Sequence, residues 1–543
     1  MPQQFLNSAE RIVDAMLGES PALAQTAGDH TYDDCLPDWS PESVAAHVRI
    51  LREAADALSQ VDTDVLPPAE AVDCTVLLAR VERTLFELTE VREHEWNPLY
   101  HNPGSLLHHL IERPFAPVAE RLEPLAGRLG AIPDALATAR EVLVDCPRVH
   151  LETAIDQFTG VAGLVRGEVD RMLDEAPALR GTVAPAQEAA IAALGEFTGW
   201  LRSKLEAAGP DIGDARDPRL GRRVWEARLW HTLDTDLTAA QIRAAAATNL
   251  ARVLEEIRET AAAITGGQPT DETVREALAR AAADRPTNET IVGLARVALT
   301  EATAFVDQFE LMSLVDDPCE IREMPEFARG VAIAYCDPPG LLETADIPTY
   351  YCISPTPTSW SAERVDSFYR EYNNQMVRNL TVHEAMPGHF LQLAHARRAS
   401  GSKKIRAVSR SGSFVEGWAT YAEELMAEHG YGGREVRLQQ LKMQLRMTIN
   451  AILDQAVHCD GMTRDEALAL MRDSGFQEEG EAVGKWRRVL LTSTQLSTYF
   501  VGYTEVAAIA RARPTGTSLR DWHDAMLSHA SPPPRHLRTL LGI

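Results

Sequence analysis

Thr381-Val-His-Glu-Ala-Met-Pro-Gly-His-Phe-Leu-Gln392 is the stretch of this sequence that says most about its fold. Its two histidines stand six residues apart, and six residues of a regular α-helix turn about 600°, which would send the rings of His383 and His389 to different faces. Pro387 has no N–H to bond the carbonyl of His383, and its ring clashes there. We therefore predict a helix break or a wide bulge near Pro387, with Gly388 supplying backbone angles that a residue with a Cβ resists.

Spacing alone leaves two interpretations of this stretch open. If the break turns both imidazoles toward one metal ion, Glu384 beside the first histidine can act as a base, as in the zincin helix, where the histidines are four residues apart. Alternatively, Thr381-Val-His-Glu384 fits a capping box at the start of a helix, and the two histidines are core residues with satisfied hydrogen bonds.

A second stretch, Phe414-Val-Glu-Gly-Trp-Ala-Thr-Tyr-Ala-Glu-Glu-Leu425, offers a third metal ligand. Helical spacing places Glu416 and Thr420 on one face, together with Glu423 or Glu424. A hydrolytic zinc keeps three protein ligands and one open position, and two histidines with one glutamate form an established set. Glu416 completes that set, although most such glutamates simply lie on a solvated helix face.

The remainder of the sequence predicts a mainly helical protein with a small sheet. Ser40-Pro41 begins one amphipathic helix, and Thr238-Ala-Ala-Gln241 has the capping-box pattern of another. Short apolar or β-branched runs bounded by Pro and Gly then predict strands over Cys319–Met324, Val331–Cys336 and Thr349–Ser354. We expect a helical region over residues 1–310 that forms one wall of a cleft, and a metal-binding region with the sheet over 311–543.

Composition limits the partners and the compartment. The 543 residues exceed the ~250–300 at which one core stops growing. Acidic residues outnumber basic ones by 79 to 53, and the net charge of −26 repels nucleic acid and anionic membranes. The sequence has neither a signal-peptide pattern at its start nor a membrane-spanning apolar run, so we expect a cytoplasmic protein. The seven cysteines include no Cys-x-x-Cys pair, which predicts reduced thiols.

The motifs His383-Glu-Ala-Met-Pro-Gly-His-Phe-Leu-Gln392 and Glu416-Gly-Trp-Ala419 resemble the bacterial family catalogued as domain of unknown function 885. Gly28-Asp-His-Thr-Tyr-Asp-Asp-Cys-Leu-Pro37 and Ser531-Pro-Pro-Pro-Arg-His-Leu537 resemble its terminal signatures, so the resemblance runs along the chain. Members look like zinc peptidases related in fold to the thimet oligopeptidase and neurolysin group. The resemblance implies a zincin-like helical fold with a small β-sheet beside the active-site helices and an internal cleft. It also implies zinc on His383, His389 and Glu416, with Glu384 as base.

A third family motif reads Pro-Gly-Gln, one or two small residues, Tyr, a basic residue and then Gly after one more position. Here the sequence is Ser493-Thr-Gln-Leu-Ser-Thr-Tyr-Phe-Val-Gly502, in which Phe500 stands where the basic residue is expected. Gln495, Tyr499 and Tyr503 are spaced so that one helix face could present all three to a cleft. The two tyrosines could equally be core aromatics with satisfied hydroxyls.

These features together predict a zinc-dependent hydrolase of peptide bonds, acting on short peptides. Tyr499 would donate a hydrogen bond to the oxyanion. Tyr351, Gln495 and Tyr503 are predicted substrate contacts, and the strand near Tyr350–Ile353 would offer backbone groups to an extended peptide. The alternatives are the same metal chemistry on a modified or non-peptide amide, and an inactive helical binding protein. The intact His-Glu-His-Glu set argues against the inactive binding protein.

Overall fold

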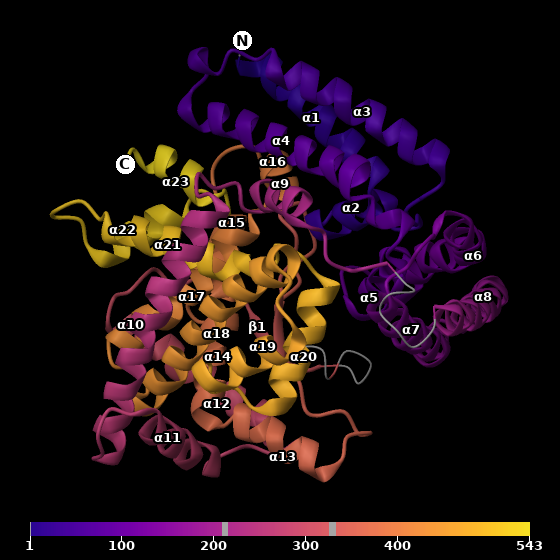
Figure 1. Ribbon diagram of the computed structural model, residues 1–543. Coiled ribbons are helices and arrows are strands. Elements are labelled where there is room, and N and C mark those ends of the chain that lie inside the picture. The colour runs from indigo at the N-terminus through magenta and orange to yellow at the C-terminus, as the bar shows by residue number, and fades with distance from the viewer. Residues whose placement is uncertain (1, 209–215, 325–328, 330–332) are drawn as a thin grey trace. The chain divides into compact units, whose positions relative to one another are not determined.

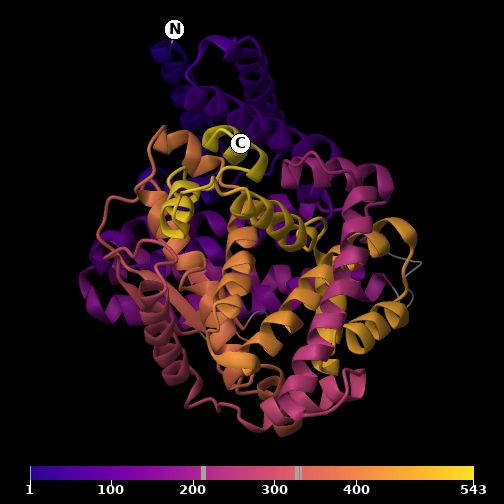
Figure 2. The same cartoon turned by 90° about the vertical axis from the view of Figure 1, so that its left-hand side faces the viewer.

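The computed structural model describes residues 2–208, 216–324, 329 and 333–543, and the protein is mainly helical with a small three-stranded sheet (Figures 1 and 2). The chain forms two compact units. Unit 1 comprises Met1–Pro218, Pro339–Ile347 and Ser402–Ser409, and unit 2 comprises Arg219–Pro338, Pro348–Gly401 and Arg410–Ile543. The first division therefore falls at Pro218 and not at residue 310, because the helices between these two positions share a core with the predicted metal-site helices.

The elements of each unit have the following bounds. The α-helices of unit 1 are α1 (Pro2–Glu19), α2 (Pro21–Ala27), α3 (Pro41–Ser59), α4 (Pro68–Phe86), α5 (Gly104–Glu112), α6 (Val118–Val142), α7 (Arg148–Glu175), α8 (Arg180–Ala207) and α16 (Lys403–Val408). Those of unit 2 are α9 (Arg222–Leu233), α10 (Ala239–Thr265), α11 (Asp271–Ala283), α12 (Ile291–Gln308), α13 (Ala362–Glu371), α14 (Asn374–Glu384), α15 (His389–Arg397), α17 (Gly412–Glu428), α18 (Gly433–Asp460), α19 (Arg464–Ala469), α20 (Glu479–Leu491), α21 (Ser497–Arg511), α22 (Leu519–Leu527) and α23 (Pro534–Leu541). The strands, all in unit 2, are β1 (Cys319–Glu323), β2 (Ala334–Asp337) and β3 (Thr349–Ile353).

Local sequence signals account for several helix starts. Ser40 caps α3 by accepting a hydrogen bond from the backbone N–H of Ser43, and Pro41 is the first helical residue. Thr238 and Gln241 form the predicted capping box at the start of α10. Both helix predictions are confirmed.

In unit 1, helices α6, α7 and α8 pack together along their apolar faces (Figure 1). Arg128 on α6 is fully buried and donates hydrogen bonds to the carbonyls of Cys35 and Leu106 and to the side chain of Gln25. A buried guanidinium needs such acceptors, because leaving its N–H groups without partners would cost several kcal/mol. The N-terminal helices are thereby tied to this three-helix core.

The N-terminal signature has a structural role within unit 1. Gly28 ends α2 in the left-handed region, with φ of 84°. The segment 339–347 lies against it, because a Cβ at Gly340 would come within 2.3 Å of the Ala27 carbonyl. His30 bridges Asp33 at 2.7 Å and Glu343, within that segment, at 3.0 Å. The signature thus anchors a distant part of the chain.

The small sheet lies in unit 2, in the order β1-β3-β2. β1 runs parallel to β3 and pairs Cys319 with Thr349, whereas β2 is antiparallel and pairs Cys336 with Tyr351. The strand predictions over Cys319–Met324 and Thr349–Ser354 are confirmed. That over Val331–Cys336 is matched by β2, apart from residues 331 and 332, which lie outside the described residues. Because β3 is the central strand, its backbone groups bond to both neighbours, and the prediction that Tyr350–Ile353 is available to an extended peptide is wrong.

Helices α17 and α21 form a close contact in the core of unit 2 (Figure 2). A Cβ on Gly417 would lie 2.3 Å from the carbonyl carbon of Gly502, and one on Gly502 would lie 2.0 Å from the Ser413 carbonyl oxygen. Thr498 lies next to Gly412, five residues before the Gly417 contact, so the two helices run side by side in the same direction. Glycine is required at this contact because the backbones touch.

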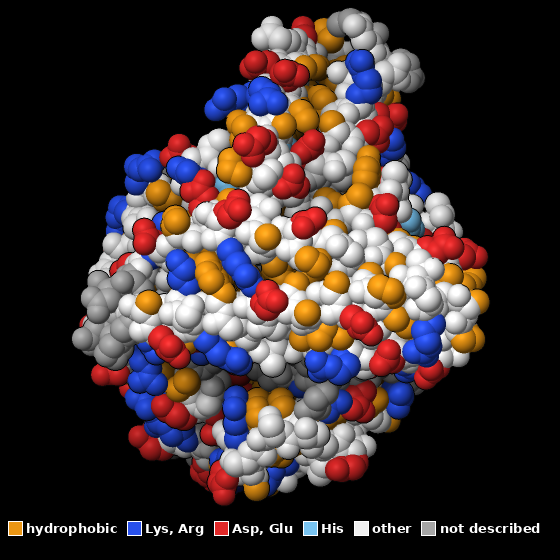
Figure 3. Space-filling view, turned by 90° about the vertical axis from the view of Figure 1, so that its right-hand side faces the viewer, with side chains coloured by type: hydrophobic (Ala, Val, Ile, Leu, Met, Phe, Trp, Pro, Cys, Tyr) orange, Lys and Arg blue, Asp and Glu red, His pale blue; other side chains and the backbone are white. Residues whose placement is uncertain are grey.

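The surface carries charges of both signs. On the face shown in Figure 3, acidic and basic side chains are interspersed, so the acidic excess is not gathered there. Within the described ranges, no helix is both long and apolar enough to span a membrane. The seven cysteines are free thiols, of which Cys74, Cys146 and Cys352 are buried.

The substitution Gly417→Ala should lower the free energy of unfolding by ~2 kcal/mol or more, because the added methyl overlaps the backbone of α21. Chemical denaturation of the purified variant measures this change. The matched control is Gly484→Ala within α20, where a Cβ would meet nothing within 4 Å. The control should be neutral or stabilise by up to ~1 kcal/mol. Equal effects at the two positions would contradict the close approach.

Folding stability should depend on pH through His30. Burial alone would lower its pKa, but the hydrogen bonds that His30 donates to Asp33 and Glu343 outweigh this and raise the pKa to about 9, from its usual 6.5. Because folding raises this pKa, protonated His30 contributes its full stabilisation of the fold below pH 6.5. That contribution is lost as the pH rises through 9. The difference in Tm between the protein and His30→Gln should therefore be large at pH 6 and small above pH 9. A difference that does not change with pH would contradict the charged bridge.

Candidate metal centre

The predicted break between the two histidines is present. Helix α14 ends at Glu384 and α15 begins at His389. Thr381 lies in the last turn of α14, whose start is capped instead by Asn373, so the capping-box interpretation of Thr381 and Glu384 is wrong. The chain thus departs from the usual zincin arrangement, in which both histidines lie on one continuous helix. Here they lie on two successive helices.

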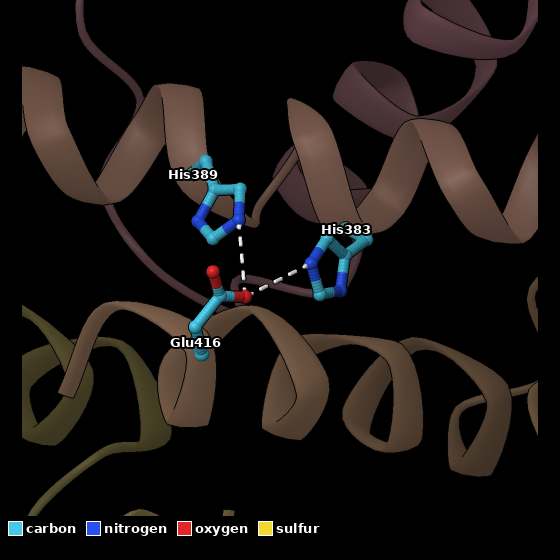
Figure 4. Close-up of side chains that lie close together, drawn as sticks. All are labelled: His383, His389 and Glu416. Carbon is cyan, nitrogen blue, oxygen red and sulfur yellow. Dashed lines mark ion pairs between the residues drawn. The ribbon is translucent and has the colours of Figure 1, made fainter. Parts of the chain in front are cut away.

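The turn between the helices is held by backbone contacts (Figure 4). The N–H of Gly388 donates to the carbonyl of Val382 at 2.9 Å, and a Cβ at Gly388 would lie 1.9 Å from the carbonyl oxygen of His383. Its backbone angles, φ −70° and ψ −130°, lie outside the α and β regions that a residue with a Cβ favours, and the close approach also requires glycine here. The Met386–Pro387 peptide is cis, and Trp418 of α17 donates from Nε1 to the Pro387 carbonyl at 2.9 Å.

The turn brings the three predicted ligands together (Figure 4). The Nε2 atoms of His383 and His389 lie 3.5 Å and 3.6 Å from the same atom, Oε2 of Glu416. The ring centroids of the two histidines are 4.7 Å apart. The ligand atoms of all three residues fall within 4.8 Å of one another.

This donor set fits a zinc ion. Ligand atoms ~2.0–2.2 Å from one tetrahedral ion lie about 3.3–3.6 Å apart, close to the separations from Glu416. Oε2 of Glu416 and Nδ1 of His389 are buried, and neither has a hydrogen-bond partner in the described structure. A buried carboxylate oxygen without a partner is costly unless a cation or a donor satisfies it. Two imidazoles and one carboxylate are ligands that zinc accepts.

A carboxylate behind the site orients His383. Oε1 of Glu423 lies 2.7 Å from Nδ1 of His383, and Oε2 of Glu423 accepts a hydrogen bond from Asn379 at 2.5 Å. The proton of the neutral imidazole is thereby held on Nδ1, and the Nε2 lone pair faces Glu416. The sequence did not identify Asn379, and it gave Glu423 no role. The available signal was spacing, because Glu423 lies two turns after Glu416 on the same face of α17.

The charged groups of the cluster favour the binding of a positive charge. Burial would raise the pKa of Glu416, but the neighbouring imidazoles of His383 and His389 hold that pKa well below its usual range. Burial would lower the pKa of His383, yet Glu416 and Glu423 raise it well above its usual value. Burial raises the pKa of Glu384. Carboxylates thus lie close to both imidazoles, an arrangement that favours a bound cation.

The C-terminal signature positions the helices that carry these ligands. The carbonyl of Ser531 accepts a hydrogen bond from the backbone N–H of Ser411, the residue that caps α17, at 2.8 Å. The Ser531 hydroxyl accepts one from the side chain of Gln392 on α15 at 2.9 Å. One residue near the end of the chain therefore fixes both α15 and α17.

Comparison with known proteins places this architecture in a family. Residues 21–541 match the family described as "Bacterial protein of unknown function (DUF885)". The chain belongs to the DUF885 family. No curated protein matches it.

Two solved structures are similar to this DUF885 chain over nearly its whole length. A "putative lipoprotein of unknown function" from Shewanella oneidensis is 26% identical, with a TM-score of 0.82, and the match covers 99% of this chain and 100% of that one. A "putative lipoprotein" from Colwellia psychrerythraea is 18% identical, with a TM-score of 0.80, over 100% of this chain and 98% of that one. The second likeness shows the fold alone.

The residues of the third motif are divided between a polar cluster and the core. Gln495 and Tyr499 are half-buried, and Arg488 of α20 donates to the side-chain oxygens of both, at 2.9 Å and 3.2 Å. Phe500, at the position of the family's basic residue, is 2% exposed and packs in the core. Arg488 thus brings a basic side chain to Tyr499 from another helix, which the sequence did not indicate.

Two other predicted substrate contacts are buried in the DUF885 chain. Tyr351 is 0% exposed, and its hydroxyl lies 3.2 Å from that of Thr381. Tyr503 is 5% exposed and donates from its hydroxyl to Glu424 at 2.8 Å. Both are core aromatics with satisfied hydroxyls, the alternative that the sequence left open for Tyr503, so neither is offered to a substrate in this structure.

The substitution Glu423→Gln should weaken binding of a divalent ion roughly 10–100-fold, because a carboxylate on the outer nitrogen of a ligating histidine orients it and raises its basicity. Titration of chelator-treated protein with zinc, against a competing indicator, measures the affinity. The control is Glu428→Gln on the same helix, where the side chain is exposed. Equal affinities in both variants would argue against this role for Glu423.

Proposed function

We propose that this DUF885 protein is a zinc-dependent hydrolase that cleaves peptide bonds in short peptides. The observation that carries the proposal is the convergence of His383, His389 and Glu416, with the carboxyl of Glu384 next to the first ligand. Three ligands leave an open position on a tetrahedral ion, which distinguishes a catalytic site from a closed structural one. The acidic residue following the first histidine is the usual base of the zincins.

The surroundings of Glu384 support a zincin-like, neurolysin-related arrangement. The Glu384 carboxylate accepts a hydrogen bond from the backbone N–H of Cys336, and it experiences the charges of His383, His389 and Glu416. Cys336 belongs to β2, an outer strand of the sheet. A sheet edge therefore lies beside the proposed base.

Each residue has a defined task in the proposed reaction. When bound, a zinc ion supplies Lewis acidity toward water and toward a carbonyl oxygen. Glu423 and Asn379 keep Nε2 of His383 directed at the site. Glu384 takes a proton from the attacking water while the new carbon–oxygen bond forms, and it delivers that proton to the leaving nitrogen as the carbon–nitrogen bond breaks.

The packing of α21 supports Tyr499 as the donor to the oxyanion. Tyr503 reaches Glu424 on α17. Because the two helices run side by side in the same direction and Thr498 lies next to Gly412, the backbone of Tyr499 lies near the start of α17, within about one turn of Glu416 along that helix. Arg488 donates to the oxygen of Tyr499, which leaves the hydroxyl proton of the tyrosine for another acceptor.

The protein should carry about one zinc per chain when purified without added metal. Elemental analysis measures this content. His389→Ala should lose the ion, because two remaining ligands hold zinc far more weakly than three. A metal content near zero that no divalent ion restores would instead support a binding protein built on the same scaffold.

Glu384→Gln should retain zinc and its fold but lose at least ~100-fold in kcat, because the amide keeps the size of the side chain and cannot accept the water proton. The measurement is cleavage of a peptide library, read by mass spectrometry, alongside zinc content. If the zinc-loaded protein cleaves no peptide but hydrolyses other amides, the substrate assignment fails and the metal chemistry stands. Unchanged turnover in Glu384→Gln would remove this residue from the mechanism.

A further inference from the structure

A cluster of basic side chains lies between α18, α20 and α21 in unit 2. Arg446 of α18 pairs with Glu481 of α20. Glu481, Lys485 and Arg488 are spaced four and three residues apart, so they share one face of α20. Arg488 reaches Tyr499 on α21. We call Arg446, Lys485 and Arg488 the cationic cluster.

The cationic cluster has more positive than negative charge. Glu481 forms an ion pair with Arg446, and Glu371 forms one with Lys442 at 2.8 Å. Arg488 bonds only to the neutral side chains of Gln495 and Tyr499 among the described residues. Two cationic side chains, Lys485 and Arg488, are therefore left without a carboxylate.

Lys485 is the least expected member of the cluster. It is 4% exposed, and no described residue forms a hydrogen bond or an ion pair with it. Burial, together with repulsion from Arg446 and Arg488, holds its pKa well below the usual range. Buried lysines are almost always paired, because an unpaired buried ammonium is very costly. An anionic ligand would supply the missing partner.

We propose that the cationic cluster binds a carboxylate of the substrate, with Lys485 and Arg488 as its direct partners. A carboxylate fits because it can accept from the arginine and the lysine at once, in charge-assisted hydrogen bonds. The inference that this carboxylate belongs to the substrate rests on the proposed function, through Tyr499. Tyr499 contacts Arg488, and by the packing of α21 its backbone lies near the start of α17, within about one turn of Glu416. The enzyme would then favour peptides whose free C-terminal carboxylate lies near the scissile bond.

Ligand binding without turnover tests the site itself. Chelator-treated protein is mixed with 4-methylpentanoate or with its neutral amide, 4-methylpentanamide, and Tm and affinity are measured. We expect the carboxylate to raise Tm and the amide to have no effect. Lys485→Met and Arg488→Gln should each weaken carboxylate binding roughly ten- to a hundredfold. Lys404→Met, which removes one positive charge from an exposed pair with Asp14 in unit 1, should bind as the unmodified protein does.

Stability in the absence of ligand supplies a second readout. Lys485→Met should have a Tm equal to or above that of the unmodified protein, because it removes a buried amino group that has no partner among the described residues. Lys442→Met should have a lower Tm, because it removes the cation that is paired with the buried Glu371. The site is refuted if 4-methylpentanoate does not stabilise the unmodified protein, or stabilises Lys485→Met equally. Equal stabilisation by sulfate at the same ionic strength would refute the choice of a carboxylate.

Hydrolysis assigns the carboxylate to the substrate. Zinc-loaded protein should show a KM at least ~10-fold lower for a peptide with a free C-terminus than for the same peptide amidated, and Lys485→Met should lose this difference. Cleavage of both peptides with one KM would overturn the assignment to the substrate terminus. Carboxylate binding without cleavage of any peptide would overturn the proposed function and leave the anion site intact.

Discussion

The carbonyl of His383 lies so close to the Cα of Gly388 that no side chain fits on that Cα, and the arrangement of the site depends on this contact. It lets α14 stop and α15 start within a few residues, which turns two imidazoles six residues apart toward one carboxylate. Trp418 fixes the same turn from α17, the helix that carries Glu416. A regular helix over this stretch would separate the two rings and leave Glu416 without partners.

The same helix contacts that pack the core of unit 2 also set the geometry of the cluster. Gly417 adjoins Glu416 and touches Gly502 of α21, so the carboxylate cannot shift without moving two helices. Ser531 ties α15 to the start of α17. The family motifs at the centre and at the C-terminus thus act on one small volume, although they lie more than a hundred residues apart in sequence.

Buried charge is compensated unevenly across unit 2. Glu423 is satisfied by His383 and Asn379, and Lys442 by Glu371, as expected for ionised groups away from water. Two groups are compensated less fully: Oε2 of Glu416 has the two histidines near it but no hydrogen-bond partner, and Lys485 has no partner among the described residues. Such groups are candidates for ligand contact, and the proposed zinc and carboxylate would satisfy them in turn.

The sequence alone determined the features that depend on residues close together in the chain. The caps of α3 and α10, the strand runs and the break at Pro387 each follow from residue type and short spacing. Spacing alone left the three converging residues open to a second interpretation, and the family resemblance indicated them as one set. The sequence could not determine which groups meet across the fold. The pairing of β3 on both sides, the burial of Tyr351 and Tyr503, the support of His383 by Asn379, and the arrival of Arg488 at Tyr499 all join segments far apart in the chain. Such contacts depend on how helices and strands pack against one another, and a periodic pattern fixes which face of an element is buried but not which neighbour covers it.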